Sequence, residues 1–309
     1  IAIEDGAIDP HSTPVTTTTG GVLSVSDEIG ENHQFSVVGS AQGHYGSLTL
    51  DPATGDWTYV LDNSLDATQA LSKAPQLPAA VPSPSATETF TVSLTDSHGA
   101  HYESNITINI YGTNDGPTVE HAITAQNAGE DAAFSFAVPA GTFADVDTGD
   151  TLTLSTGSLP AWLSFDANTG TFSGTPTNGD VGTTQVTVTA TDSQGAQVST
   201  TFDLVVNNTN DTPTLNPIAS VNVDEDGTQA SGQFTATDPD TGDTLTYAIA
   251  SPVAGLVVNS DGSWRFDPTD ATYQSLAEGQ PQTLTIPVTV TDAAGATDTQ
   301  NLVIQITGT

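Results

Sequence analysis

The sequence predicts an all-β protein of three tandem antiparallel β-sandwich domains that follow one another as a linear rod. Three observations support this prediction. Several segments alternate between apolar and polar residues, turn signals separate them every ~8–12 residues, and a set of short motifs recurs three times in the same order. No stretch keeps the period of an amphipathic helix, and only residues 66–71 could form a short helical turn.

The composition limits the partners of the chain. Its 309 residues include 37 Asp and Glu but only 2 Lys and Arg, which gives a formal net charge of −35. This charge disfavours nucleic acid and anionic membrane surfaces, and no apolar run approaches the ~18 residues of a membrane span. Apolar residues make up 36% of the chain, enough for packed cores. The chain has no Cys for disulfides or thiolate metal sites, so a hard divalent cation is the expected means of rigidifying it.

Four motifs define the repeat. Asn-Asp occurs at 114–115 and 210–211, and Thr-Asp-x-x-Gly-Ala begins at residues 95, 191 and 291. Asp-x-Asp-x-x-Asp occurs at 145–150 and 238–243, and a Glu-Asp pair occurs at 4–5, 130–131 and 225–226. The order of these motifs predicts three domains, at residues 1–114, 115–210 and 211–309. Because Gly308-Thr309 matches Gly112-Thr113, the chain is expected to be a fragment of a longer array.

The strand pattern places the acidic motifs at the ends of the domains. Alternating segments occur in every repeat, with roughly seven strands expected per domain. In such a sandwich the Asp-x-Asp-x-x-Asp loop and the later Thr-Asp turn lie at the end that the preceding linker enters. The Glu of the upstream domain lies on the other side of the same linker. The first junction is predicted to gather Glu4, Asn114, Asp115, Asp145, Asp147, Asp150 and Asp192. The second is predicted to gather Glu130, Asn210, Asp211, Asp238, Asp240, Asp243 and Asp292.

Such a gathering of oxygens predicts calcium. Ca²⁺ takes six to eight oxygen ligands, several of them carboxylates, from loops that can wrap around it. A single Asp in a turn is an ordinary structural residue, but carboxylate motifs duplicated in order favour a metal site. The corresponding loop of the first domain, Asp27-Glu28-Ile29, lacks the second Asp, and a weaker site is expected there.

Two further patterns resemble known families. The segments Gly46–Leu50 and Gly55–Tyr59 parallel Gly255–Val258 and Gly262–Phe266, and both pairs resemble VCBS-type repeats. The middle domain, with Leu159–Phe165 followed by Thr169–Pro176, resembles the dystroglycan-type cadherin-like (CADG) domain. Tandem mixtures of the two are typical of RTX adhesins of Gram-negative bacteria. The resemblance covers the whole chain and implies Ig-like or cadherin-like sandwiches.

The junction pattern is also similar to the interdomain calcium sites of cadherins. In those sites an Asn-Asp linker, an Asp-x-Asp loop, a later Asp and an upstream Glu share two or three ions. The cadherin Leu-Asp-Arg-Glu element has only a loose counterpart here, at Leu61-Asp62-Asn63. The resemblance therefore implies Ca²⁺ as the cofactor and supports most strongly the ion between the linker and the Asp-x-Asp loop.

The expected function follows from these resemblances. They imply a calcium-rigidified extender or spacer segment of a large RTX adhesin, secreted by the type I route to the surface of a Gram-negative bacterium. There it would project ligand-binding domains, as in biofilm adhesion. The expected partners are calcium and neighbouring repeats of the same chain, and the segment is expected to be monomeric. The alternative is a carbohydrate- or peptide-binding module with the middle domain as the binder.

Other motifs are weaker. No Gly-x-Ser-x-Gly elbow or phosphate-binding Gly-x-x-x-x-Gly-Lys loop is present, and no enzyme is predicted. His98 and His101 are interpreted as solvated turn residues rather than a transition-metal pair. The three tryptophans, Trp57, Trp162 and Trp264, are expected to pack in cores rather than to stack on sugars. The Pro-rich stretch 74–84 is expected to be an extended surface loop inserted in the first domain.

Overall fold

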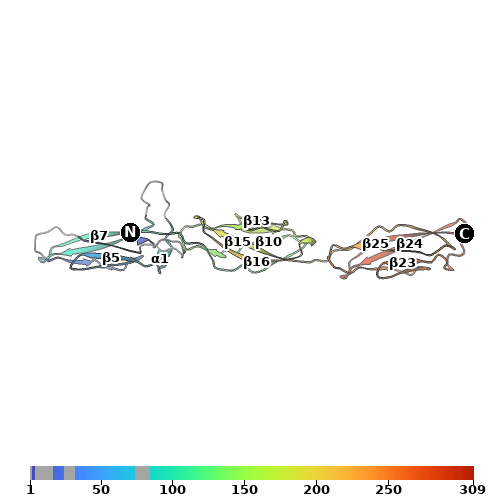
Figure 1. Ribbon diagram of the computed structural model, residues 1–309, viewed down its shortest axis with the longest axis horizontal. Helices are drawn as coiled ribbons and strands as arrows, with labels where there is room; N and C mark the ends of the chain where they lie inside the picture. Colours follow the sequence, from blue (N-terminus) through green and yellow to red (C-terminus); the bar gives the residue numbers. More distant parts are fainter. Residues whose placement is uncertain (1, 4–16, 24–31, 74–83) are drawn as a thin grey trace. The chain divides into compact units, whose positions relative to one another are not determined.

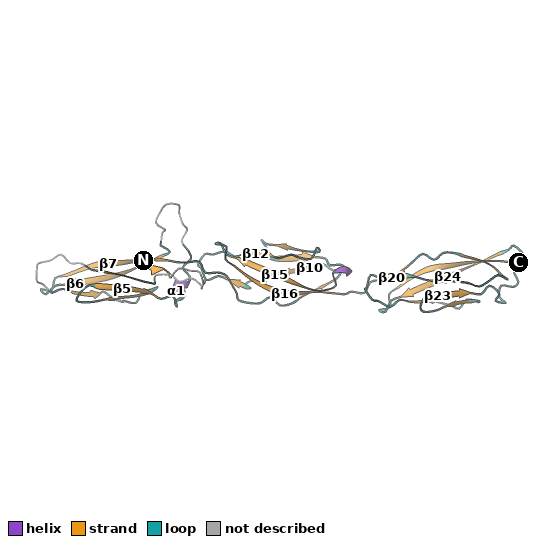
Figure 2. Ribbon diagram, in the orientation of Figure 1, coloured by secondary structure: helices purple, strands orange, loops and turns teal. Residues whose placement is uncertain are grey.

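The chain is all-β, as the sequence predicts (Figures 1 and 2). The computed structural model describes residues 2–3, 17–23, 32–73 and 84–309. The chain divides into two compact units. One comprises residues 1–126, 135–174 and 184–204, and the other comprises 127–134, 175–183 and 205–309. Glu4, Asp27, Glu28 and most of the Pro-rich stretch lie outside the described residues.

The first sandwich consists of two sheets, with strand orders β1-β7-β6-β3 and β2-β5-β4. β1 runs parallel to β7, and the other pairings are antiparallel. The predicted helical turn is present as α1. The elements are β1 (Ala2–Ile3), β2 (Thr18–Val22), β3 (Gln34–Val37), β4 (Gly46–Leu50), β5 (Asp56–Leu61), α1 (Asp66–Gln69), β6 (Ala86–Thr95) and β7 (His101–Tyr111).

The middle sandwich has strand orders β12-β15-β16-β9 and β10-β14-β13, with a separate pair of β11 and β8. A 3₁₀ turn, η1 (Asn178–Asp180), precedes β15. The strands are β8 (Thr118–Val119), β9 (Gln126–Gly129), β10 (Phe134–Ala137), β11 (Phe143–Ala144), β12 (Thr153–Thr156), β13 (Leu163–Asp166), β14 (Thr171–Gly174), β15 (Gly182–Thr191) and β16 (Gln197–Asn207).

The third sandwich repeats this plan. Its strand orders are β18-β25-β24-β21 and β19-β23-β22, with a separate pair of β17 and β20. β18 is parallel to β25, as β1 is to β7. The strands are β17 (Thr214–Leu215), β18 (Val221–Asp224), β19 (Ala230–Gln233), β20 (Ala236–Thr237), β21 (Thr246–Ile249), β22 (Leu256–Val258), β23 (Ser263–Phe266), β24 (Pro281–Thr291) and β25 (Thr297–Thr307).

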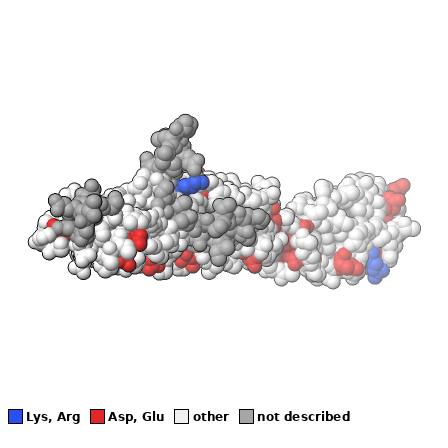
Figure 3. All heavy atoms as spheres, turned by 60° about the vertical axis from the view of Figure 1, so that its left-hand side comes forward, with Lys and Arg blue, Asp and Glu red and all other residues white. Residues whose placement is uncertain are grey.

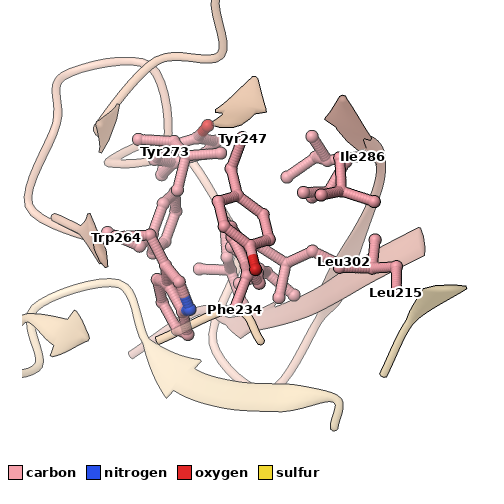
Figure 4. Close-up of a cluster of buried hydrophobic side chains, with 13 residues drawn as sticks. Leu215, Phe234, Tyr247, Trp264, Tyr273, Ile286 and Leu302 are labelled. Carbon is pink, nitrogen blue, oxygen red and sulfur yellow. The ribbon is translucent and has the colours of Figure 1, made fainter. Parts of the chain in front are cut away.

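Period-two alternation builds the core of each sandwich. In β24 the side chains of Ile286, Val288 and Val290 are buried, while Pro287 and Thr289 between them are more exposed. Figure 4 shows Ile286 in one cluster with aromatic side chains of the core, in which the rings of Phe234 and Trp264 stack with centroids 5.9 Å apart. Removing this apolar surface from water is the main stabilising contribution to each sandwich.

The core of the middle sandwich contains a cluster of three phenylalanine rings. The ring centroid of Phe172 lies 6.3 Å from that of Phe136 and 5.7 Å from that of Phe202. Phe172 is fully buried. The difference agrees with the sequence, in which the first and third domains resemble each other more than either resembles the second.

Candidate metal centre

The first acidic loop is folded by its own hydrogen bonds. β11 ends at Ala144, and the carboxylate Oδ1 of Asp145 accepts a hydrogen bond of 2.9 Å from the backbone N–H of Asp147. The N–H of Asp150 donates to the carbonyl of Asp147 at 3.2 Å. These turns bring one carboxylate oxygen from each of the three aspartates within 4.8 Å of the others. An Asx turn of this kind explains the Asp at position 145, whereas the carboxylate of Asp147 accepts the N–H of Asp115.

The linker between the first two sandwiches is held against this loop. The N–H of Asp115 donates to Oδ2 of Asp147 at 2.9 Å, and Nδ2 of Asn114 donates to Oδ2 of Asp192 at 2.8 Å. The other oxygen of Asp192 accepts backbone N–H groups in the β15–β16 hairpin. The linker, the acidic loop and the hairpin therefore contact one another. We call this site, formed by Asn114, Asp115, Asp145, Asp147, Asp150 and Asp192, the first junction.

The second junction has the same arrangement. The N–H of Asp240 donates to Oδ1 of Asp238 at 2.9 Å, and the N–H of Asp211 donates to Oδ2 of Asp240 at 2.8 Å. Nδ2 of Asn210 reaches Oδ2 of Asp292 at 2.8 Å. Two linkers of different sequence thus make the same hydrogen bonds to their acidic loops.

Two groups of carboxylates form at the second junction. One joins Glu130, Asp211 and Asp240, and the other joins Asp238, Asp243 and Asp292, each with ligand atoms within 4.8 Å of one another. Glu130 follows β9, and its Oε1 accepts the N–H of Thr209 at 2.5 Å. The first group therefore draws its acids from both sides of the linker, whereas the second belongs to the third sandwich alone.

The donor set fits a hard cation. Buried polar oxygens in proteins nearly always have a hydrogen-bond partner, because an unsatisfied one is costly. Six buried oxygens at the junctions have none among the described residues, although Glu130 is only 1% exposed and Asp147 only 4%. They are Asn114 Oδ1, Asp145 Oδ2, Asp147 Oδ1, Asp150 Oδ2, Glu130 Oε2 and Asp238 Oδ2. Carbonyl and carboxylate oxygens of this kind are the ligands that Ca²⁺ prefers.

The electrostatics agree with this fit. Burial, reinforced by the neighbouring carboxylates, raises the pKa of Asp147 to about 6, although the N–H of Asp115 acts in the opposite direction. Burial also raises the pKa of Asp145. For Asp192, burial alone would raise the pKa, but hydrogen bonds from Asn114 and the hairpin amides lower it. At Asp145 and Asp147 the hydrogen bonds do not outweigh burial, and the pKa rises. At Asp192 the hydrogen bonds prevail, and the pKa falls.

All the predicted site residues in the described part of the chain lie at the two junctions. Sequence reasoning missed three neighbours. Ser193 Oγ donates to Asp150 Oδ1, Nδ2 of Asn178 in η1 donates to Asp211 Oδ2, and Nδ2 of Asn208 donates to Asp240 Oδ1 at 2.9 Å. Asn208 takes the place that Gly112 has in the first linker, so the repeat comparison could not find it.

The weaker motifs do not form a comparable centre. His101 Nε2 lies 3.3 Å from Glu103 Oε1, and neither His98 nor His101 belongs to a group of three metal-binding side chains in the described ranges. Trp264 is buried, as expected for a core residue, while Trp57 and Trp162 are half-buried. In the part of the chain that the structure describes, no helix is long and apolar enough to cross a membrane.

The fold and the junctions define a tandem β-sandwich protein of the Ig-like, cadherin-like class. Residues 3–112 and 210–308 match the family model described as "Bacterial cadherin-like domain", and residues 116–207 match "Putative Ig domain". The first of these models covers more than half of the chain. The chain therefore belongs to the bacterial cadherin-like domain family. Domains of this adhesion type are generally non-enzymatic.

Solved structures agree on the fold. Mouse cadherin-23 EC22-24 aligns with a TM-score of 0.59 and 17% identity, over 99% of this chain and 94% of that one. PcdhgB3 EC1-4 aligns with a TM-score of 0.63 and 13% identity, over 100% and 75%. Human CDH23 EC21-23 aligns with a TM-score of 0.55 and 16% identity, over 89% and 88%. Identities this low show a shared fold only, and none of the curated proteins matches the sequence.

Proposed function

We propose that this chain is a calcium-rigidified extender segment of a large bacterial adhesin at the cell surface, where it holds ligand-binding domains away from the cell. One observation carries the proposal. At each junction, buried carboxylate oxygens that have no hydrogen-bond partner among the described residues gather where a short linker is tied to an acidic loop. A bound Ca²⁺ would supply the missing partner and offset two of the negative charges that repel each other there.

The grouping of the acids suggests how many ions each junction takes. At the second junction, Glu130, Asp211 and Asp240 would hold one ion that bridges the linker, and Asp238, Asp243 and Asp292 would hold another beside it. At the first junction, Asp145, Asp147 and Asp150, together with the Asn114 carbonyl, would hold at least one ion. Sites in extracellular modules bind Ca²⁺ with Kd values of about 10⁻⁴ to 10⁻³ M, so the segment would be loaded outside the cell.

The cellular setting is part of the proposal. The VCBS-type character of the outer domains, the RTX adhesin context, type I secretion from a Gram-negative cell and a role in biofilms rest on the repeat pattern alone. We place the domain boundaries at 1–114, 115–210 and 211–309 and expect a monomer. A role of the middle domain in binding carbohydrate or peptide gains no support from its large aromatic residues, because Phe136, Phe172 and Phe202 pack against one another.

Small-angle X-ray scattering tests rigidification. An ion shared by groups on both sides of a linker should restrict the hinge, so the distance distribution should be narrow with Ca²⁺ and should broaden with EDTA. The double substitution Asp238→Ala and Asp240→Ala should broaden it even with Ca²⁺. As a control, Asp166→Ala and Asp261→Ala remove two exposed turn aspartates outside the junctions. Scattering that is identical with Ca²⁺ and EDTA would refute the extender mechanism.

A further inference from the structure

A cavity of about 570 Å³ lies beside the first junction, within a single compact unit. Its wall is formed by the end of α1 and the residues after it, by the turn at residues 44–45, and by Thr148 of the acidic loop. A backbone hydrogen bond of 3.1 Å from the N–H of Thr148 to the carbonyl of Ala70 joins two of these walls. Cavities of 300–1,000 Å³ are the usual size of small-molecule sites.

The turn at residues 44–45, which lines this cavity, is held by a buried carboxylate. Glu88 is only 8% exposed, and its Oε1 accepts the backbone N–H groups of both His44 and Tyr45. Its Oε2 accepts the hydroxyl of Tyr59 at 2.6 Å. The rings of His44 and Tyr45 meet edge to face with centroids 4.7 Å apart. A Cβ on Gly43 would clash with the Glu88 carboxylate, so a larger residue there would have to displace this group.

The lining residues carry hydrogen-bond donors that have no acceptor in the described part of the chain. Lys73, Tyr45, Ser72 and Thr148 are among the lining residues, and the Lys73 ammonium group and the three hydroxyls make no hydrogen bond within the described residues. Such groups gain most from a ligand that brings several acceptors at once.

The charge of the lining is unusual for this chain. Lys73 is one of only two Lys and Arg residues beside 37 acidic ones, and none of the described residues that line the cavity is Asp or Glu. The basic side chains stand isolated on the surface in Figure 3. Another cavity, of about 390 Å³, is lined by Asp96, and one of about 330 Å³ in the third sandwich has no charged residue. The lining at Lys73 therefore favours a ligand with a negative charge.

We propose that this cavity binds a sugar acid, that is, a polyhydroxylated ring carrying one carboxylate. The carboxylate would accept hydrogen bonds from Lys73, the ring hydroxyls would bond to Ser72, Thr148 and the Tyr45 hydroxyl, and the ring C–H groups would pack on the aromatic pair. The site belongs to the first sandwich and its seam with the acidic loop. It goes beyond the extender role, and none of its proposed ligand contacts uses a residue assigned to calcium.

Titration of the whole chain with D-glucuronate, D-galacturonate and N-acetylneuraminate tests the site, with saturation-transfer NMR as the readout. At least one of these sugar acids should bind saturably below about 10 mM, and D-glucose and acetate should bind at least tenfold more weakly. Lys73→Gln and Tyr45→Phe should each weaken the binding about tenfold, since each removes a donor to the ligand. The matched control is Arg265→Gln, which changes the net charge equally at an exposed residue outside the cavity and should leave the affinity unchanged.

Three results would overturn the proposal. They are no saturable binding of any of the three sugar acids, equal binding of glucose or acetate, and binding that survives Lys73→Gln. Running each titration with Ca²⁺ and with EDTA separates this site from the extender function, because the calcium-dependent melting of the chain is read independently. Unchanged melting temperatures of Lys73→Gln and Tyr45→Phe would establish that any loss of binding is local.

Discussion

At Asp147, burial and the neighbouring carboxylates both raise the pKa of the side chain. Its pKa is raised from the ordinary value of 3.8 to about 6. Without metal, the folded chain therefore binds a proton at this side chain more tightly than the unfolded chain does. The stability that this group contributes is therefore fully present below about pH 4 and is lost as the pH rises through about 6. Protons and Ca²⁺ compete for the same oxygens.

This competition gives the first prediction. Calcium affinity measured by isothermal titration calorimetry should fall between about pH 7.5 and pH 5, because protonating Asp147 and Asp145 removes ligands. With EDTA and no free Ca²⁺, the free energy of unfolding should instead rise as the pH is lowered from about 7.5 to 5. Asp147→Asn should flatten both dependences. A calcium affinity that is the same at both pH values in the unmodified chain would show that these carboxylates are not ligands.

A second prediction concerns the buried Glu88. Tyr59→Phe should destabilise the first sandwich by about 1–3 kcal/mol, because it leaves Oε2 of Glu88 buried without its donor. In the third sandwich, Phe266 pairs with Leu256 in the way that Tyr59 pairs with Leu48, so the fold accepts an apolar ring at this position. The double substitution Tyr59→Phe with Glu88→Leu should therefore cost less than the sum of the two single changes, as measured in urea unfolding. Strict additivity would contradict the coupling.

At the scale of single elements, close backbone approach determines where glycine is required. In β19, a Cβ on Gly232 would lie 2.8 Å from the ring of Trp264, which packs in the core of the third sandwich. The paired strands of the first sandwich place Gly21 against Trp57 in the same register. In both outer sandwiches, therefore, a tryptophan packs against a glycine on the neighbouring strand.

The third prediction tests this packing. Gly232→Ala should destabilise the chain by about 1–3 kcal/mol, because the indole ring must move to admit the methyl group. Gly157→Ala is the matched control, since its Cβ would meet no atom within 4 Å, and it should change stability by less than about 0.5 kcal/mol. Thermal unfolding followed by tryptophan fluorescence compares the two. Equal effects would mean that the contact with Trp264 does not matter.

The long hairpin strands and the acidic loops were predictable from the sequence, because each follows from a local pattern. The alternation at 283–290 lies within β24, and the turn at residues 66–71 contains α1. Less could be predicted where partners come from distant segments. The contact of Asn178 with Asp211 depends on how η1 meets the linker, and Glu88 has no counterpart in the third domain that the repeat comparison could reveal.

At the scale of the whole molecule, the account depends on calcium. With 37 acidic residues and 2 basic ones, the folded chain repels itself, most strongly where carboxylates are crowded at the junctions. A ligand that binds only the folded state stabilises it by about 2.7 kcal/mol at a concentration 100-fold above its Kd. The repeated linker contacts would then serve to arrange the carboxylates before an ion arrives.

Calcium titration of the intact chain and of the paired variant Asp147→Asn with Asp240→Asn tests the central claim most directly. Each substitution keeps the shape of the side chain and removes its charge. The unmodified chain should bind Ca²⁺ at both junctions and melt at a higher temperature with Ca²⁺ than with EDTA. The paired variant should lose most of the binding and of the stabilisation. The pair Asp166→Asn with Asp261→Asn, both exposed turn residues, should keep them. If the Asp147 and Asp240 variant binds as many ions as the unmodified chain, with the same affinity, the junction carboxylates are not the calcium site and the account is wrong.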